Sequence, residues 1–215
     1  ALEAVTDSGY EPVRSYHLAW SRYRLGETAD ARETIAAVVD DLPADLQVDG
    51  RYLYAWTLYR GRELPEARSQ LLRILGESLS RSDEVRTRQL LATLHLEEGD
   101  FDGALSQYRT RADTADESTE RIRYEQLIAT TLASAGELQQ AVMRYDDLAD
   151  RFPDTRPGQM ALLESGELLY RIGSLRQSRE RFREYQARFP DGPDLDRALY
   201  WAGLTSYELD EAGRS

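Results

Sequence analysis

The sequence predicts an all-α fold, a solenoid in which helix hairpins are stacked one after another. Three observations support this prediction. Gly99, Gly136 and Gly173 lie 37 residues apart, two columns of small residues share nearly the same period, and the apolar residues between them follow helical spacing. No segment shows the period-2 alternation of a strand. The apolar content of 41% is enough to bury a core, so disorder is excluded.

The small-residue columns set the register of the repeats. The column in the expected first helices is Ala19, Ala55, Ala92, Ala129, Gly166 and Gly203. The column in the expected second helices is Ala31, Ala67, Ala104, Ala141, Ser178 and Ser215. Small residues let two helices approach closely. We therefore expect one solenoid within residues 1–215, with units over 12–47, 48–84, 85–121, 122–158 and 159–195 and a partial unit over 196–215.

One unit illustrates the expected hairpin. Between residues 161 and 190, one helical stripe is Leu162, Ser165, Gly166, Leu169 and Ile172, and a second is Leu175, Ser178, Phe182, Tyr185 and Phe189. Gly173 separates the stripes, where glycine can adopt the left-handed conformation that ends a helix. Pro153 and Pro190 follow the expected second helices, and Pro157 and Pro193 stand where the next first helices begin.

These residues resemble a tetratricopeptide repeat. The matching positions are Ala161, Leu162, Ser165, Gly166, Leu169, Tyr170, Gly173, Leu175, Ser178, Phe182, Tyr185 and Pro190. The resemblance covers nearly the whole chain. It implies about eleven antiparallel helices in a right-handed superhelix whose first helices line a concave face.

A second resemblance concerns the ends of two units, residues 151–154 and 188–191, which both read Arg-Phe-Pro-Asp. These endings are similar to those in bacterial cell-envelope repeat proteins, including the outer-membrane assembly lipoprotein and the Tol-associated periplasmic factor. The resemblance implies an envelope scaffold in the periplasm, with the cytoplasm as the alternative. We also expect the chain to be a fragment of a longer protein.

Candidate binding residues lie on the expected concave face. The first two units carry twin sets, Tyr16, Trp20, Tyr23 and Arg24 against Tyr52, Trp56, Tyr59 and Arg60. The next two units share Arg86 and Gln89 against Arg123 and Gln126, and Tyr170 and Arg171 follow near the end. Aromatic and arginine side chains are typical of binding hot spots, and arginine binds carboxylates through two hydrogen bonds. The alternative is that the aromatic side chains only pack against neighbouring helices.

Charge and motif content narrow the function classes. All 27 basic residues are arginine, and the net charge of -12 argues against nucleic acid and anionic membrane surfaces as partners. The chain has no cysteine, and its two histidines, His17 and His95, fall in different units. No phosphate-binding loop or nucleophile motif is present. We therefore expect no catalysis, cofactor, metal or direct membrane insertion. The expected partner is a protein or peptide, and the alternative is a structural module for self-association or domain spacing.

Overall fold

The computed structural model describes residues 10–115 and 118–212 of the chain. Within these ranges there are eleven α-helices and no strand, which confirms the predicted all-α class of stacked hairpins. The helices are α1 (Glu11–Arg24), α2 (Thr28–Ala36), α3 (Ala44–Arg60), α4 (Leu64–Leu75), α5 (Arg81–Glu97), α6 (Phe101–Thr114), α7 (Ser118–Ser134), α8 (Leu138–Arg151), α9 (Arg156–Arg171), α10 (Leu175–Arg188) and α11 (Leu195–Ala212). None of the helices in the described part of the chain is both long enough and apolar enough to cross a bilayer.

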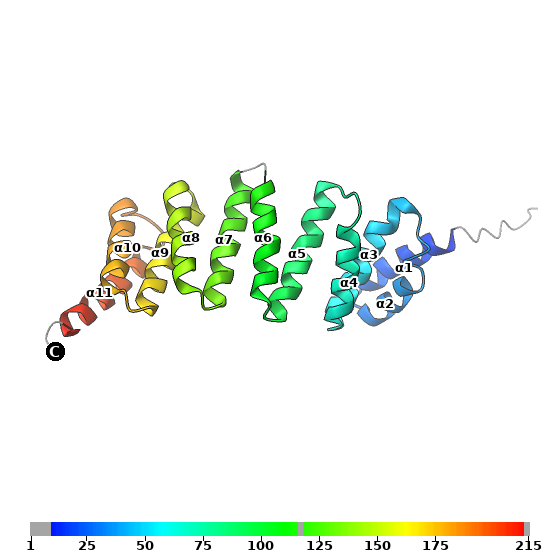
Figure 1. The fold of residues 1–215 in the computed structure, drawn as a ribbon, viewed down its shortest axis with the longest axis horizontal. Coiled ribbons are helices and arrows are strands. Elements are labelled where there is room, and N and C mark those ends of the chain that lie inside the picture. Colours follow the sequence, from blue (N-terminus) through cyan, green and yellow to red (C-terminus); the bar gives the residue numbers. More distant parts are fainter. Residues whose placement is uncertain (1–9, 116–117, 213–215) are drawn as a thin grey trace, which may run out of the picture. The chain divides into compact units, whose positions relative to one another are not determined.

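The helices form two compact units, one ending at Asp100 and the other beginning at Phe101. The first unit contains α1 to α5, and the second contains α6 to α11 (Figure 1). The right-handed superhelix over the whole chain stays a prediction. Ser215, the last member of the second small-residue column, lies outside the described residues.

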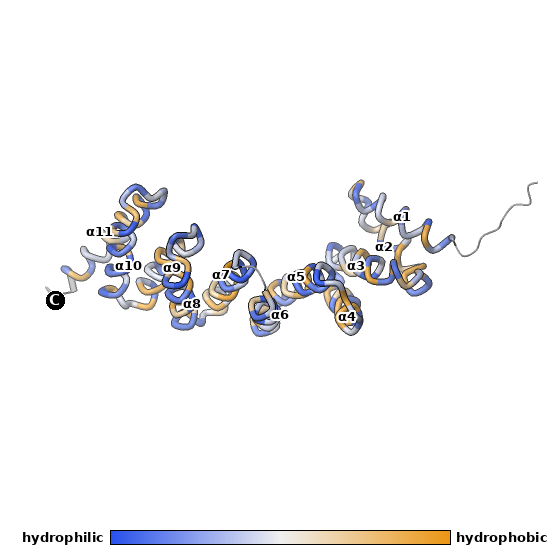
Figure 2. Tube along the Cα trace, turned by 90° about the horizontal axis from the view of Figure 1, so that it is seen from above, coloured by the Kyte–Doolittle hydropathy of each residue, from blue (hydrophilic) through white to orange (hydrophobic). Residues whose placement is uncertain are grey.

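Within each unit, helices contact their neighbours in the chain, and the first helices of successive hairpins also contact one another. In the first unit α1 packs on α2 and α3 packs on α4, while α3 also contacts α1 and α5. In the second unit α9 contacts α7, α8, α10 and α11. Hydrophobic and hydrophilic residues alternate along the individual helices, as amphipathic packing requires (Figure 2). The first helices of successive hairpins therefore form a continuous surface within each unit.

The turn inside each hairpin uses one left-handed residue. Gly26, Gly99, Gly136 and Gly173 have φ angles of 85°, 73°, 84° and 78°, which confirms the predicted role of the glycines. In the second hairpin this position is Arg62, with φ 66°, while Gly61 has φ -81°. A non-glycine residue in this region costs about 1 kcal/mol, so the second turn is locally strained.

The small-residue columns lie where helices touch. Ala19, Ala55, Ala92 and Ala129 in first helices and Ala31, Ala67, Ala104 and Ala141 in second helices are all 0% exposed. At Gly166 a Cβ atom would lie 2.8 Å from the Phe182 ring, and the Ser178 hydroxyl donates a hydrogen bond of 2.8 Å to the Gly166 carbonyl. The columns thus fix the distance between the paired helices.

Candidate functional site

A small cavity opens between α1 and α3, the first helices of the first two hairpins. It has a volume of about 140 Å³ and is lined by Trp20, Tyr23, Tyr52, Leu53 and Trp56. We call it the aromatic pocket. The positions follow from helical spacing, because residues three or four apart share one face of a helix. The pocket therefore brings together four of the residues predicted from the twin sets, and all four are partly exposed.

Hydrogen bonds hold the two tryptophans of the pocket in place. The Trp20 indole N–H donates to the Tyr16 hydroxyl, one turn earlier in α1, at 2.9 Å. The Trp56 indole N–H donates instead to the Tyr23 hydroxyl, which links α3 to α1. The Trp20 and Tyr23 rings pack edge to face with centroids 5.7 Å apart. The twin sets are alike in sequence, but their tryptophans have different hydrogen-bond partners.

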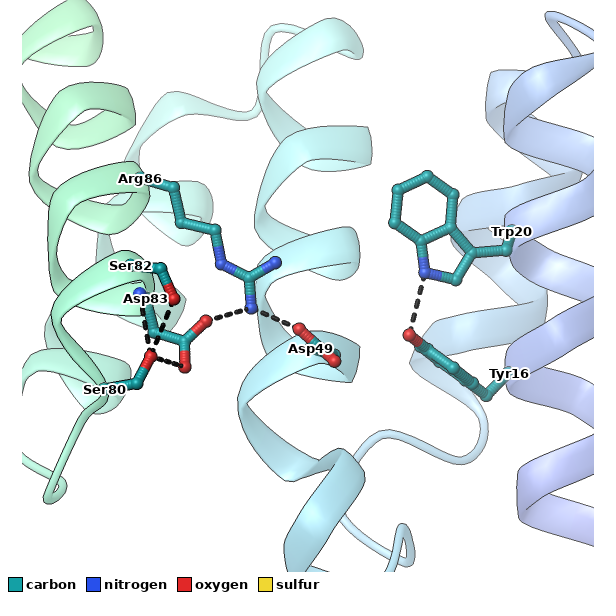
Figure 3. Close-up of polar contacts among 7 residues, drawn as sticks. All are labelled: Tyr16, Trp20, Asp49, Ser80, Ser82, Asp83 and Arg86. Carbon is teal, nitrogen blue, oxygen red and sulfur yellow. Dashed lines mark hydrogen bonds and ion pairs between the residues drawn. The ribbon is translucent and has the colours of Figure 1, made fainter.

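An acidic cluster lies beside the pocket. Figure 3 shows the Arg86 guanidinium between the carboxylates of Asp49 and Asp83, with the Tyr16–Trp20 pair of α1 beyond Asp49 in this view. Ser80 caps α5, because its hydroxyl accepts the Asp83 backbone N–H at 3.2 Å. The Arg86 guanidinium also stacks over the Tyr52 ring, 4.6 Å from its centroid. Arg86 thus already holds two carboxylates of the protein.

The tyrosines near the pocket are neutral at physiological pH. Burial raises the pKa of Tyr16 and of Tyr52 above the ordinary value of 10.0. The Asp49 charge adds to this rise at Tyr16, whereas the Arg86 charge opposes it at both residues. Tyr16 is only 6% exposed, so it supports Trp20 from behind rather than offering a surface to a ligand. Of the predicted residues around the pocket, Tyr16 alone has a mainly packing position.

Two other predicted aromatic residues tie successive repeats together. The Tyr59 hydroxyl donates to Glu97 at 2.6 Å, and the Tyr170 hydroxyl donates to Glu208. In both pairs the tyrosine and the glutamate are 38 residues apart and lie in successive repeats. The same contact therefore occurs once in each of the two compact units. These bonds raise the pKa of both tyrosines. Tyr59 therefore helps to position α5 against α3, and Tyr170 helps to position α11 against α9.

The remaining predicted residues are spread over both units. Arg24, Arg60, Gln89, Arg123 and Arg171 are exposed, and Gln126 is partly exposed. Arg123, Gln126, Tyr170 and Arg171 belong to the second unit, on α7 and α9. A shared groove that joins them to the aromatic pocket stays a prediction. Within the described part of the chain, no three His, Asp or Glu side chains are close enough together to hold a metal ion.

Two residues of the site were missed from the sequence. Leu53 completes the wall of the pocket, and Asp49 supplies the carboxylate beside it. The comparison of twin sets finds only residues that the first two repeats share. The position of Leu53 is occupied by His17 in the first repeat. The signal for Asp49 was its position three residues before Tyr52, which places both on one face of α3.

Comparison with known proteins supports the repeat assignment. A family model described as "Tetratricopeptide repeat" matches residues 16–79 and 127–193, more than half of the chain. A search of curated proteins gave no match.

Solved structures share the fold at low identity. A tetratricopeptide repeat protein from Parabacteroides merdae has a TM-score of 0.63 and 14% identity, over 95% of this chain and 75% of that chain. YrrB, described as a TPR protein with an unusual peptide-binding site, has a TM-score of 0.59 and 13% identity, over 92% and 94%. MamA has a TM-score of 0.62 and 12% identity, over 85% and 93%. At these identities the likeness concerns the fold alone.

Proposed function

Because this chain belongs to the tetratricopeptide repeat family, we propose that it is a non-catalytic scaffold that binds a protein or peptide partner. The observation that carries the proposal is the aromatic pocket, which leaves Trp20 and Trp56 partly exposed on the first helices instead of burying them. Partly exposed tryptophans around a cavity are typical of binding hot spots. The peptide-binding site named for YrrB is consistent with such a use of the fold.

The pocket fits one side chain of a partner rather than a whole helix. An apolar cavity of about 150 Å³ accommodates a benzene molecule, and the aromatic pocket has about 140 Å³. The neighbouring surface of α1, α3 and α5 would hold the backbone on either side of that anchor. Arg24 and Arg60 lie exposed in the last turns of α1 and α3, where they can meet acidic groups of the partner.

A selection from a displayed random-peptide library tests the proposal. Peptides selected on the wild-type protein should not bind the double variant Trp20→Ala/Trp56→Ala. The matched control is Tyr200→Ala, which removes an aromatic side chain that is 66% exposed on α11 in the second unit. Selected peptides that bind the double variant as well as the wild type would contradict the proposed site.

We also propose that the protein works in the bacterial cell envelope, on the periplasmic side, with the cytoplasm as the alternative. The support is the pair of Arg-Phe-Pro-Asp endings at 151–154 and 188–191. Fractionation of the native cells tests this placement. Release of the protein with the periplasmic contents is expected, and recovery with the cytosolic fraction would overturn it.

A second candidate function, self-association, is favoured by the surface of α11. Leu199, Tyr200 and Tyr207 are 51%, 66% and 65% exposed. One repeat earlier, the counterparts Leu162 and Leu163 are buried. Sedimentation velocity distinguishes this candidate, because self-association through α11 should disappear in Tyr200→Ser/Tyr207→Ser and persist in Trp20→Ala/Trp56→Ala.

A further inference from the structure

The walls of the aromatic pocket offer ring faces, and both of their indole N–H groups already have acceptors. The Trp20 and Trp56 indole N–H groups donate to Tyr16 and Tyr23. A carboxylate that entered the pocket would lose its hydration and find neither indole N–H free, which is costly. The faces of aromatic rings carry negative charge density and attract cations.

The protein already places a cation against this group of rings. The Arg86 guanidinium lies over the Tyr52 ring, 4.6 Å from the centroid, on the side where Asp49 and Asp83 pair with it. One positive and two negative groups leave this cluster with a net negative charge. The electrostatic surroundings of the pocket therefore favour a second cation over an anion.

The negative charge reaches the opposite wall as well. In Figure 3 Asp49 on α3 stands between Arg86 and the Tyr16–Trp20 pair of α1, and the Asp49 charge contributes to the raised pKa of Tyr16. The exposed Arg24 and Arg60 stand in the last turns of their helices, next to the carbonyl ends that positive charge stabilises. They stand one turn after Trp20 and Trp56, whereas Asp49 lies towards the N-terminal end of α3.

We infer that the aromatic pocket binds a positively charged group of the partner, an ammonium or guanidinium side-chain end, through the rings of Trp20, Tyr23, Tyr52 and Trp56. This inference rests on the proposed function and specifies the chemistry of its anchor. An acidic group is disfavoured at this place, because Arg86 already pairs with Asp49 and Asp83.

The test uses choline and its uncharged isostere 3,3-dimethylbutan-1-ol as probes. The chain has three tryptophans, so the indole N–H signals in a ¹⁵N-resolved NMR spectrum report on Trp20 and Trp56, while Trp201 on α11 serves as an internal control. Choline should shift the Trp20 and Trp56 signals in a saturable manner and leave Trp201 unchanged. The alcohol should bind at least about fivefold more weakly. Sodium chloride at equal concentration controls for ionic strength.

Two variants sharpen the result. Trp56→Leu should abolish the choline response, and Asp49→Asn should weaken it while both tryptophan signals keep their dispersion. Equal or tighter binding of the alcohol, or no saturable shift with choline, would overturn the cation inference. The proposed function would survive that outcome if selected peptides still require Trp20 and Trp56. Conversely, choline binding without any selected peptide would remove the proposed function and leave the cation site.

Discussion

Arg86 and Asp49 hold the same position in successive repeats, 37 residues apart, and their side chains form an ion pair. Asp83, one turn before Arg86, binds the same guanidinium at 2.7 Å. The pairing connects α5 to α3 beside the aromatic pocket. Arg86 therefore helps to position the pocket wall, in addition to any contact with a partner.

Reversal of the charge at Arg86 should destabilise the first unit. Arg86→Glu would place three carboxylates together, and we expect a loss of about 1 kcal/mol in the free energy of unfolding for these partly exposed groups. The charge swap Arg86→Glu/Asp49→Arg should recover part of that loss. Urea unfolding of the wild type, both single variants and the double variant measures the coupling. Additive effects would show that the pair contributes nothing.

This pair also marks what the sequence could and could not predict. The repeat period, the glycine turns and the small-residue columns follow from one-dimensional spacing, and the structure confirms them at Gly99, Gly136 and Gly173. Arg86 and Asp49 are different residue types in one column, so a search for similar residues finds Arg86 through its likeness to Arg123 but does not reveal its pairing with Asp49. Their attraction depends on the contact of α3 with α5, which only the packed helices provide.

The aromatic residues of the pocket could be predicted from the sequence, but their contacts could not. The aromatic residues repeat at an interval of 36 residues and were found from the sequence. Trp56 donates its hydrogen bond to Tyr23 of the neighbouring helix, and this contact depends on the distance between α1 and α3. The sequence predicts Arg86 as a binding residue, but it does not show that Asp49 and Asp83 already occupy its guanidinium.

Gly166→Ala should destabilise the second unit. Its new Cβ atom would lie 2.8 Å from the Phe182 ring, which is 0% exposed and has no room to move. We expect a loss of about 1–3 kcal/mol from overpacking. The matched control is Gly203→Ala, one repeat later, where nothing lies within 4 Å of the new atom. The control should be neutral or stabilised by up to about 1 kcal/mol, because alanine favours a helix. Thermal unfolding followed by circular dichroism compares the two, and equal melting temperatures would contradict the packing described.

The ion pair between the buried Arg111 and Glu120 predicts a large loss of stability when Glu120 loses its charge. Arg111 is 2% exposed, and its guanidinium lies 2.5 Å from Glu120 and 5.7 Å from the centre of the Tyr124 ring. Glu120→Gln leaves a buried charge without its counter-charge, so we expect a loss of about 3 kcal/mol. Asp147→Asn, which breaks the exposed pair with Arg151, should cost less than about 0.5 kcal/mol. Urea unfolding measures both, and similar losses in the two variants would contradict this difference.

Stability should fall at alkaline pH. Burial raises the pKa of Tyr52, Tyr108 and Tyr145 above 10.0, whereas the unfolded chain keeps the ordinary value. Above pH about 10 the unfolded state therefore loses protons first, and the free energy of unfolding decreases as pH rises towards the folded-state pKa. Below that pH the contribution of these tyrosines is fully present. The urea midpoint should be constant in mildly alkaline solution and then drop, with a smaller drop in Tyr145→Phe. An unchanged midpoint at strongly alkaline pH would refute this linkage.

Binding at the aromatic pocket is tested by the affinity of one selected peptide for the wild type and for Trp20→Ala/Trp56→Ala, measured by isothermal titration calorimetry. Removal of an aromatic hot spot typically costs about 2 kcal/mol, or roughly thirtyfold in affinity. At least that loss is expected in the double variant, with an unchanged helical circular dichroism spectrum and full affinity in Tyr200→Ala. Full affinity in the double variant would contradict a binding site at the aromatic pocket.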